Sequence, residues 1–240
     1  RGIISRLKLC VNIIAAVNRI HSANKYVIVD LKPQNLLITP SGKISIIDMD
    51  SIQIVENDKV LFNAPVSTPE YTPPEANTIV SKKKIITKDW DVFSLGVLVY
   101  EILFGIHPFV GSAKPPNDNL NTIQEKIKIN LSHVVNGEQA FKMLPKPHKL
   151  FYSFPSDLRS ILKKIFEPYI LGKSKRPDLE SLGGVLFNTI KVFEESAKKE
   201  KELEKKEAIK RYPGLKMDYD KLKSRNKEIQ VELEKYKDEM

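Results

Sequence analysis

Four side chains suited to phosphate chemistry stand close together in the first quarter of the sequence. Asp30, Lys32 and Asn35 lie within the stretch VDLKPQN, and Asp48 follows in IIDMDS. A carboxylate can accept the proton of a hydroxyl group, and a lysine can contact a phosphate. Carboxylate and amide oxygens are also ligands that Mg²⁺ accepts. The four residues therefore indicate phosphoryl transfer, although hydrolysis of small phosphoesters needs a similar set.

Short strands are expected to position these residues. KYVIVD ends at Asp30, NLLITP begins at Asn35, and SGKISIID ends at Asp48. All three stretches are rich in branched aliphatic residues, as strands are, and the Ser41-Gly42 turn predicts a hairpin between the second and the third.

The rest of the first 195 residues is expected to be mostly helical. Apolar residues recur every three or four positions over residues 3–22, which predicts an amphipathic helix. KDWDVFSLGVLVYEILFG is apolar nearly all round and predicts a buried central helix that ends at Gly105. Residues 51–87 are punctuated by proline and are expected to be irregular. Further helices are predicted over 118–130, 156–168 and 177–195.

The C-terminal segment has a different composition. From about residue 196 it is rich in lysine and glutamate, and YPGL at 212–215 should interrupt the helix because proline lacks an amide donor. The apolar residues that follow show the alternating spacings of a heptad repeat, with Asn226 at one a position. They are Leu215, Tyr219, Leu222, Ile229, Leu233, Tyr236 and Met240. The pattern predicts a homodimer through residues 215–240, and the alternative is one amphipathic helix folded back on the globular part.

Composition limits the class of protein. The chain has 240 residues, 41% of them hydrophobic, which is enough for one large domain or a domain with an appendage. The net charge of +9 comes from lysine mixed with glutamate, which is typical of a solvated helical face, and nucleic-acid binding is the alternative. The single Cys10 excludes an intrachain disulfide and fits a reducing cytoplasm. No apolar run approaches the ~20 residues that span a membrane.

Five stretches occur in the order and at the spacing of the eukaryotic-like protein serine/threonine kinases, which the sequence resembles. They are DLKPQNLLI, IIDMDS, STPEYTPPE, DVFSLGVLVYEILFGIHPF and KRPD. The variants DMD and YTPPE resemble a divergent bacterial branch of that family. The resemblance implies a fold that is mainly α with a small β component. A kinase C-terminal lobe would occupy residues 1–195, and a charged helical extension would occupy 196–240, partly coiled-coil-like from 215.

The resemblance also implies a role for each candidate site residue. Asp30 would be the catalytic base, Lys32 the contact to the γ-phosphate, and Asn35 and Asp48 the magnesium ligands. Leu37 would form the floor of the adenine pocket. The implied cofactors are ATP and Mg²⁺, and the implied substrate is a protein.

Four further residues match scaffold positions of the family. Thr68 would hold the base and the lysine in place, and Asp91 would cap the backbone of the catalytic loop. Glu75 and Arg176 would form a buried ion pair that ties the activation segment to the helical lobe.

The sequence departs from the family pattern in three places. Ile28-Val29 replaces His-Arg, so control by phosphorylation of the activation loop is not expected. Asp50 replaces the glycine of Asp-Phe-Gly and could be a further metal ligand or a turn residue. No Gly-rich loop, strand lysine or partner glutamate precedes the catalytic loop, so the N-terminal lobe is expected to be missing and the chain, which opens at Arg1, to be part of a longer protein.

Three functions follow from these observations. The first is a protein serine/threonine kinase, of which this chain alone would bind ATP weakly. The second is a catalytically inactive, kinase-like scaffold that dimerises through its C-terminal helix. The third is a nucleic-acid-associated kinase-like protein. The four histidines show no mutual spacing of a metal site and are expected to be structural or exposed: His21, His107, His133 and His148.

Overall fold

The computed structural model describes residues 2–57, 59–64, 67–81, 85–168, 175–212 and 214–238, with the side chains of residues 80, 81, 214–216 and 231–238 outside that description. The chain divides into two units, Arg1–Ile190 and Lys191–Met240. The predicted boundary after residue 195 falls inside a helix and stays a prediction.

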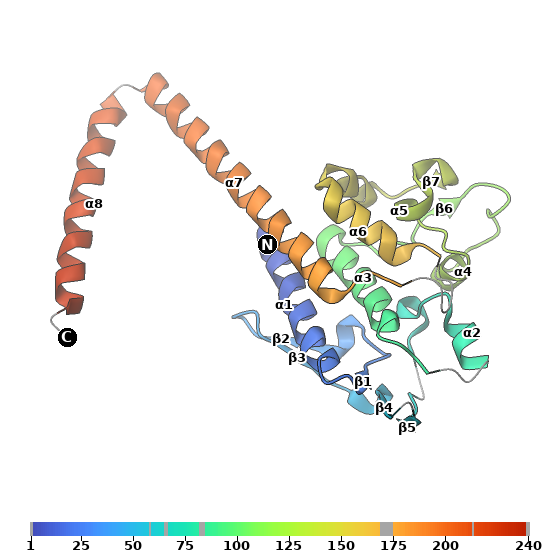
Figure 1. The fold of residues 1–240 in the computed structure, drawn as a ribbon. Helices are drawn as coiled ribbons and strands as arrows, with labels where there is room; N and C mark the ends of the chain where they lie inside the picture. Colours follow the sequence, from blue (N-terminus) through green and yellow to red (C-terminus); the bar gives the residue numbers. More distant parts are fainter. Residues whose placement is uncertain are drawn as a thin grey trace. The chain divides into compact units, whose positions relative to one another are not determined.

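Helices make up most of the described chain, with a few short strands (Figure 1). The helices are α1 (Ile3–His21), α2 (Ala76–Ser81), α3 (Asp89–Phe104), α4 (Ile123–Lys128), α5 (His133–Asn136), α6 (Ser156–Phe166), α7 (Leu179–Arg211) and α8 (Gly214–Asp238). The strands are β1 (Tyr26–Val27), β2 (Leu36–Ile38), β3 (Ile44–Ile46), β4 (Gln53–Glu56), β5 (Lys59–Phe62), β6 (Ser112–Ala113) and β7 (Phe141–Met143). The predicted class, mainly α with a small β component, is confirmed.

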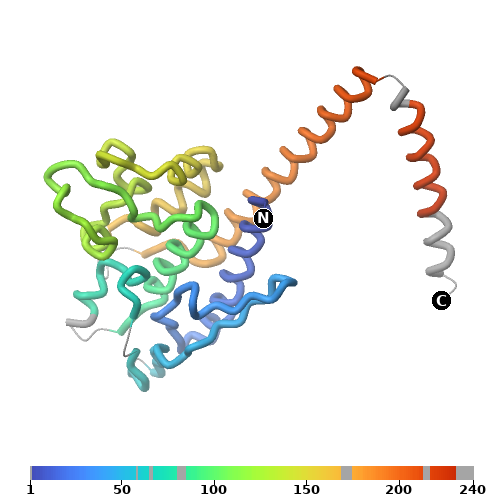
Figure 2. Tube along the Cα trace, turned by 180° about the vertical axis from the view of Figure 1, so that it is seen from behind, coloured from blue at the N-terminus to red at the C-terminus, as the bar shows by residue number. Residues whose placement is uncertain are grey.

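The central helix of the first unit is α3. It is buried almost all round and ends at Gly105, which has φ +74°, as the sequence predicts. It contacts α1 and α6 (Figures 1 and 2). Phe93 of α3 packs edge to face on Phe166 of α6, with ring centroids 5.7 Å apart. A Cβ added at Gly96 would lie 2.5 Å from Ile165 Cγ2, so glycine permits the close approach of the two helices.

The predicted amphipathic helix is α1. Its buried face includes Leu7, Ile14 and Val17, and it packs against α3. Cys10 lies on the same face, and burial raises the pKa of its thiol far above the usual range. The thiol is therefore a packing group, not a reactive one.

The predicted hairpin is present, since β2 and β3 pair antiparallel with Leu36 opposite Ile46. The prediction that residues 51–87 are irregular is wrong, because this segment contains β4, β5 and α2. QIVE and KVLF form two strands that pair antiparallel around Asn57, which has φ +50°. The prolines on which that prediction depended all follow β5. β1, β4 and β5 form a three-stranded sheet in the order β1-β4-β5.

Several predicted boundaries are wrong. The strand expected up to Asp30 ends at Val27, because the chain turns at Val29. The helix expected from 118 begins only at Ile123, where Thr122 and Glu125 form a capping box. The third predicted helix continues to Arg211.

Hydrogen bonds join a series of four polar rings, of which three are buried and one, Tyr100, belongs to α3. The Val110 carbonyl can only accept, so His148 Nε2 donates to it at 2.9 Å, and His148 Nδ1 accepts from the Tyr100 hydroxyl at 2.7 Å. Tyr100 in turn accepts from His133 Nε2 at 2.5 Å, which leaves His133 Nδ1 to accept from the Tyr152 hydroxyl at 3.3 Å. Desolvation lowers the pKa of His133 to about 3 and of His148 to about 4, so both rings are neutral.

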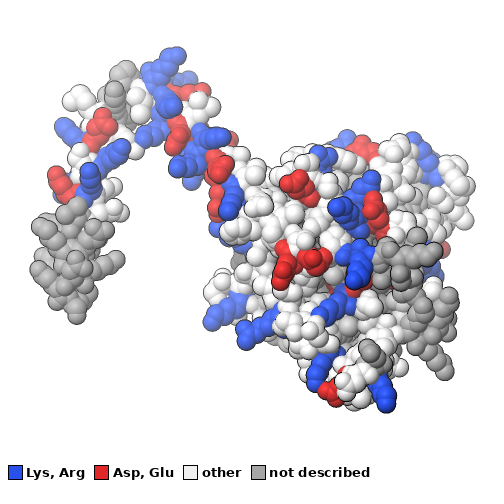
Figure 3. Space-filling model, in the orientation of Figure 1, with Lys and Arg blue, Asp and Glu red and all other residues white. Residues whose placement is uncertain are grey.

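The second unit contains the later part of α7 and α8. α7 ends at Arg211 and α8 begins at Gly214, which confirms the predicted break at YPGL. Lys and Arg are mixed with Asp and Glu along the part of this unit whose side chains are described (Figure 3). Inside it, Lys205 Nζ lies 3.5 Å from the centroid of the Tyr219 ring. Among the described residues, no helix combines the length and the apolar character needed to cross a membrane.

Candidate active site

Asp30 is the centre of a small hydrogen-bond network. Its Oδ1 accepts hydrogen bonds from the amide N–H of Thr68 at 2.8 Å and from Thr68 Oγ1 at 2.7 Å. Its Oδ2 accepts one from Lys32 Nζ at 2.7 Å, and Lys32 also donates to Thr68 Oγ1 at 3.0 Å. The structure therefore brings these three predicted residues into direct contact.

These contacts fix the charge on Asp30. Desolvation acts to raise the pKa of its carboxyl, because the residue is buried. Hydrogen bonds from Lys32 and Thr68, together with the positive charge of Lys32, outweigh desolvation, so the pKa lies below its usual value. Asp30 is therefore a carboxylate at neutral pH and can accept a hydrogen bond from a hydroxyl group.

The backbone just before Asp30 has a conformation that is rare for its residue type. Val29 has φ +67°, and the N–H of Asp30 donates to the Ile28 carbonyl at 2.8 Å, which closes a three-residue turn. Positive φ strains a β-branched residue, so the turn needs support. Asp91 accepts hydrogen bonds from the N–H of Ile28 at 2.7 Å and of Val29 at 2.8 Å. The predicted capping role of Asp91 is confirmed, and His21 Nε2 lies 2.8 Å from the same carboxylate.

Asn35 and Asp48 place oxygen atoms beside this network. Asn35 ends the short 3₁₀ helix Pro33–Asn35, and its Nδ2 donates to the Asp30 carbonyl at 2.9 Å. Within the described part of the chain, no hydrogen bond occupies Asn35 Oδ1 or the Asp48 carboxylate. Asp48 has φ +57°, a conformation that aspartate tolerates. Both residues line a cavity of about 550 Å³ together with Lys32 and Thr68.

This pair of oxygen donors suits magnesium. Among the described residues, no group of three or more His, Cys, Asp or Glu side chains is placed to hold a metal ion. Mg²⁺ commonly takes one or two protein oxygens and completes its shell with phosphate oxygens and water. Asn35 and Asp48 fit such an ion better than a metal held by protein groups alone.

A further part of the lining of the cavity was not predicted. Tyr71 donates to Glu101 Oε2 at 2.8 Å, and His107 Nε2 donates to the Glu70 carbonyl at 2.9 Å. Glu101 is the single charged residue in VLVYEILF, and this signal could have marked it as a site residue. The remaining lining residues are Gln34, Glu70, Tyr71, Glu101, His107 and Ile123.

A buried ion pair anchors the segment that follows Thr68. Arg176 Nη2 donates to Glu75 Oε2 at 3.0 Å, and Nη1 pairs with Oε1. Arg176 Nε also donates to the Ile165 carbonyl at 2.9 Å, and the guanidinium lies 5.3 Å from the centroid of the Phe93 ring. The predicted pair is confirmed, and it ties this segment to α3 and α6.

Leu37 does not line this cavity. It lies on β2 with 55% of its surface exposed. Its role in binding adenine stays a prediction.

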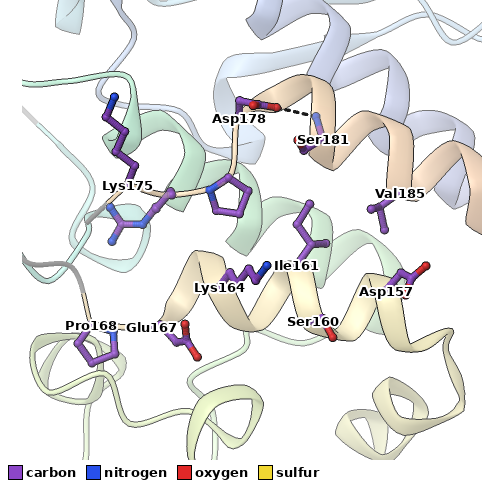
Figure 4. Close-up of a pocket in the computed structure, with 12 residues that line it drawn as sticks. Asp157, Ser160, Ile161, Lys164, Glu167, Pro168, Lys175, Asp178, Ser181 and Val185 are labelled. Carbon is purple, nitrogen blue, oxygen red and sulfur yellow. Dashed lines mark hydrogen bonds between the residues drawn. The ribbon is translucent and has the colours of Figure 1, made fainter. Parts of the chain in front are cut away.

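A larger cavity of about 750 Å³ lies between α6 and the start of α7 (Figure 4). It shares no residue with the cavity beside Asp30. Lys164 and Asp157 of α6 line it, and so does Asp178, which accepts a hydrogen bond from the N–H of Ser181 at 2.7 Å. Both signs of charge are present, so its wall favours no single class of ligand.

Comparison with known proteins places the chain in a family. The family model for the protein kinase domain matches residues 5–183. Citron rho-interacting kinase of Rattus norvegicus is 34% identical over 119 residues, which are 48% of this chain and 6% of that protein. Serine/threonine-protein kinase 17A of Oryctolagus cuniculus is 38% identical over 110 residues, or 45% of this chain and 26% of that protein. Rho-associated protein kinase let-502 of Caenorhabditis briggsae is 34% identical over 102 residues, which are 42% of this chain and 8% of that protein.

The match therefore spans only a minor part of each of these relatives. The match to the family model covers the segments that carry the candidate site, since residues 5–183 include Asp30, α3 and Arg176. The chain belongs to the protein kinase domain family, as its motifs predict.

Proposed function

We propose that the protein containing this chain transfers the γ-phosphoryl group of ATP to serine or threonine hydroxyls of a protein substrate, and that this chain is the lobe with the catalytic loop. The observation that carries the proposal is the contact of Asp30, Lys32 and Thr68 beside oxygens of Asn35 and Asp48 that accept no hydrogen bond within the described residues. The names of the similar kinases support the same reaction.

Asp30 would accept a hydrogen bond from the attacking hydroxyl and hold its proton as the new oxygen–phosphorus bond forms. In the present arrangement Lys32 occupies Asp30 Oδ2. When Lys32 turns to a phosphate, that oxygen becomes available and the carboxylate loses a neighbouring positive charge. Asp30 then becomes a stronger base at the moment when the phosphate is in place.

The proposed cofactors are ATP and Mg²⁺, with the ion held by Asn35 and Asp48. Magnesium neutralises charge on the phosphates when it is bound. Leu37 would meet the adenine ring, and its exposure on β2 together with that of Ile38 and Ile47 supports a second, nucleotide-clamping lobe as partner.

The test uses the longest natural protein that contains this sequence. Magnesium-dependent transfer of labelled γ-phosphate is measured for wild type and for Asp30→Asn and Asp48→Asn. Loss of the base or of the metal ligand is expected to lower kcat by roughly 10²–10⁴-fold. Asp157→Asn, an exposed carboxylate on α6, is the matched control and should keep wild-type activity.

Transfer by Asp30→Asn at the wild-type rate would show that Asp30 is not the base. A folded wild-type protein without any transfer would favour the kinase-like scaffold instead.

One observation supports the second candidate, a catalytically inactive kinase-like scaffold that dimerises through its C-terminal helix. Leu222 and Ile229 of α8 are 62% and 45% exposed, at heptad positions that would face a second chain. In a parallel homodimer through residues 215–240, Asp218 could meet Lys223 of the second chain. Met240 and the side chains of Leu215, Leu233 and Tyr236 lie outside the described residues.

The finer assignments rest on sequence features. The DMD and YTPPE variants support a divergent bacterial branch of the family. The single buried Cys10 supports a reducing cytoplasm. Nucleic-acid binding has less support, because positive and negative side chains are mixed along the described part of the second unit (Figure 3).

A further inference from the structure

Gln53 is a buried amide with a specific pair of partners. It is 1% exposed on β4, its Nε2 donates to the Ile86 carbonyl at 2.8 Å, and its Oε1 accepts from the Ile86 N–H at 3.0 Å. A backbone N–H can only donate and a carbonyl can only accept, so the orientation of the amide is fixed. Gln53 therefore clamps the chain just before α3 to the strand that follows Asp48.

Ile86 connects Gln53 to the residues that precede Asp30. Ile86 belongs to one buried cluster with Val27, Val29 and Trp90. Val27 also lies opposite Gln53 in the β1–β4 pair. Trp90 Nε1 donates to the Val29 carbonyl at 2.9 Å. The cluster thus touches the turn that ends at Asp30 on its apolar side.

The turn at Val29 depends on such support. Asp91 accepts hydrogen bonds from the N–H groups of Ile28 and Val29, while Trp90 donates to the Val29 carbonyl. A β-branched residue with positive φ keeps that conformation only when its surroundings hold it from more than one side. Ile86 packs in the same buried cluster as Val29 and Trp90, and Gln53 holds Ile86, so both belong to these surroundings.

We propose that Gln53 is a positioning residue for Asp30, acting through Ile86 and Trp90 on the turn at Val29. As a statement about catalysis, the proposal rests on the proposed kinase function. The claim that Gln53 supports the turn at Val29 does not depend on that function.

Gln53→Glu is the most informative variant, because it keeps the shape and changes one donor. The ionised carboxylate would face the Ile86 carbonyl and repel it, whereas the protonated form restores the missing donor. Burial raises the pKa of a carboxyl, so the variant should be defective at about pH 8 and largely recovered at about pH 6. Gln139→Glu is the matched control, since Gln139 is exposed and donates to the Asn136 carbonyl at 2.6 Å.

The first readout is amide hydrogen exchange, which needs no activity. In Gln53→Glu at about pH 8, exchange at residues 28–30 and 86 should be at least about tenfold faster than in wild type, after correction for intrinsic rates. The difference should shrink at about pH 6 and be absent in the control. Unchanged exchange at residues 28–30 would overturn the proposal.

The second readout is phosphoryl transfer by the longest natural protein with the same variants. Per folded molecule, kcat of Gln53→Glu should fall at least about tenfold at about pH 8 and recover at about pH 6, with KM values within about threefold. Faster exchange with unchanged kcat would overturn the positioning role and leave the kinase function intact. If wild type shows no transfer, the proposed function fails, and exchange still decides whether Gln53 holds the turn. If Gln53→Glu does not fold, Gln53→Asn, which is too short to reach both groups of Ile86, takes its place.

Discussion

The carboxylate of Asp30 shows how single hydrogen bonds decide a chemical state. Burial alone would favour its neutral form, but donors from Lys32 and Thr68 reverse that preference. The same two side chains also fix the direction in which the carboxylate points. The state of the base is therefore a property of its neighbours, which can be changed one at a time.

Thr68→Val should raise the pKa of Asp30, because it removes the hydroxyl that donates to Oδ1 and leaves desolvation less opposed. The pKa can be measured from the carboxyl carbon shift of Asp30 in NMR spectra. Because the pKa of Asp30 is lower in the folded chain than in the unfolded chain, its carboxylate stabilises the fold at pH values above the pKa of the unfolded chain. This contribution is lost as pH falls, so the variant, in which it is smaller, should lose less stability in acid. Thr39→Val, on an exposed turn, is the control, and an unchanged pKa in Thr68→Val would contradict the assignment.

Breaking one partner of the buried ion pair should cost more than breaking an exposed one. Arg176→Ala leaves the Glu75 carboxylate buried without its cation, and the free energy of unfolding should fall by about 3–5 kcal/mol. Lys25→Ala removes an exposed pair with Glu56 and should have no measurable effect. Urea unfolding of both variants measures the difference, and equal losses would show that burial does not govern these pairs.

At the scale of elements, periodicity predicted the long helices well and the short ones poorly. α1 and α3 have continuous apolar patterns, and Gly105 marks the end of α3. α5, β6 and β7 have four residues or fewer, which is too short for a pattern to be visible. The β4–β5 pair likewise consists of two strands of four residues each, and the prolines that follow it predict an irregular segment.

The candidate site was also predicted only in part. Asp30, Lys32, Asn35 and Asp48 are close in sequence, so their spacing was informative. The wall with Tyr71 and Glu101 comes from residues 30 positions apart, which only the packing of α3 brings together.

The contact between α3 and α6 leaves no space for a methyl group at Gly96. Gly96→Ala places a methyl group 2.5 Å from Ile165, so the free energy of unfolding should fall by about 1–3 kcal/mol. Gly184→Ala in α7 is the matched control, because no atom lies within 4 Å of its added Cβ. Because alanine is favoured over glycine inside a helix, the free energy of unfolding of this control should rise by about 0.5–1 kcal/mol. Thermal unfolding measures both variants. A Gly96→Ala variant as stable as wild type would mean that α3 and α6 move apart at little cost.

At the scale of the whole molecule, the folded chain keeps three histidines neutral. Desolvation lowers the pKa of His107 and His148 to about 4 and that of His133 to about 3. The unfolded chain binds protons at these rings below about pH 6.5, where the folded chain does not. The contribution of these histidines to the free energy of unfolding is therefore fully present above that pH and is lost as pH falls toward about 4.

Each of the three histidines should contribute a slope of up to about 1.4 kcal/mol per pH unit between about pH 6 and 4.5. Urea unfolding at a series of pH values measures the total. His107→Gln keeps a donor for the Glu70 carbonyl and should reduce the slope by about one third. A flat profile over this range would contradict the neutral assignment.

The heptad residues of α8 predict the size of the molecule in solution. If α8 pairs with a second copy, sedimentation equilibrium should give about twice the 27.4 kDa of one chain. Asn226→Leu should tighten the association and admit other oligomeric states, because an apolar a position no longer selects one alignment. Asn188→Leu, at an exposed position of α7, is the control, and a monomeric wild type would favour the folded-back helix.

The ring chain beside α3 has a consequence for how this protein can evolve. Tyr100, His133 and His148 each donate one hydrogen bond and accept one, so the direction set by Val110 passes through all of them to Tyr152. Replacing one ring with an apolar side chain leaves a donor or an acceptor of its neighbour buried without a partner. The cost of a second replacement then depends on the first, so the four positions should behave as one epistatic unit, tolerated in matched combinations that single substitutions do not reach.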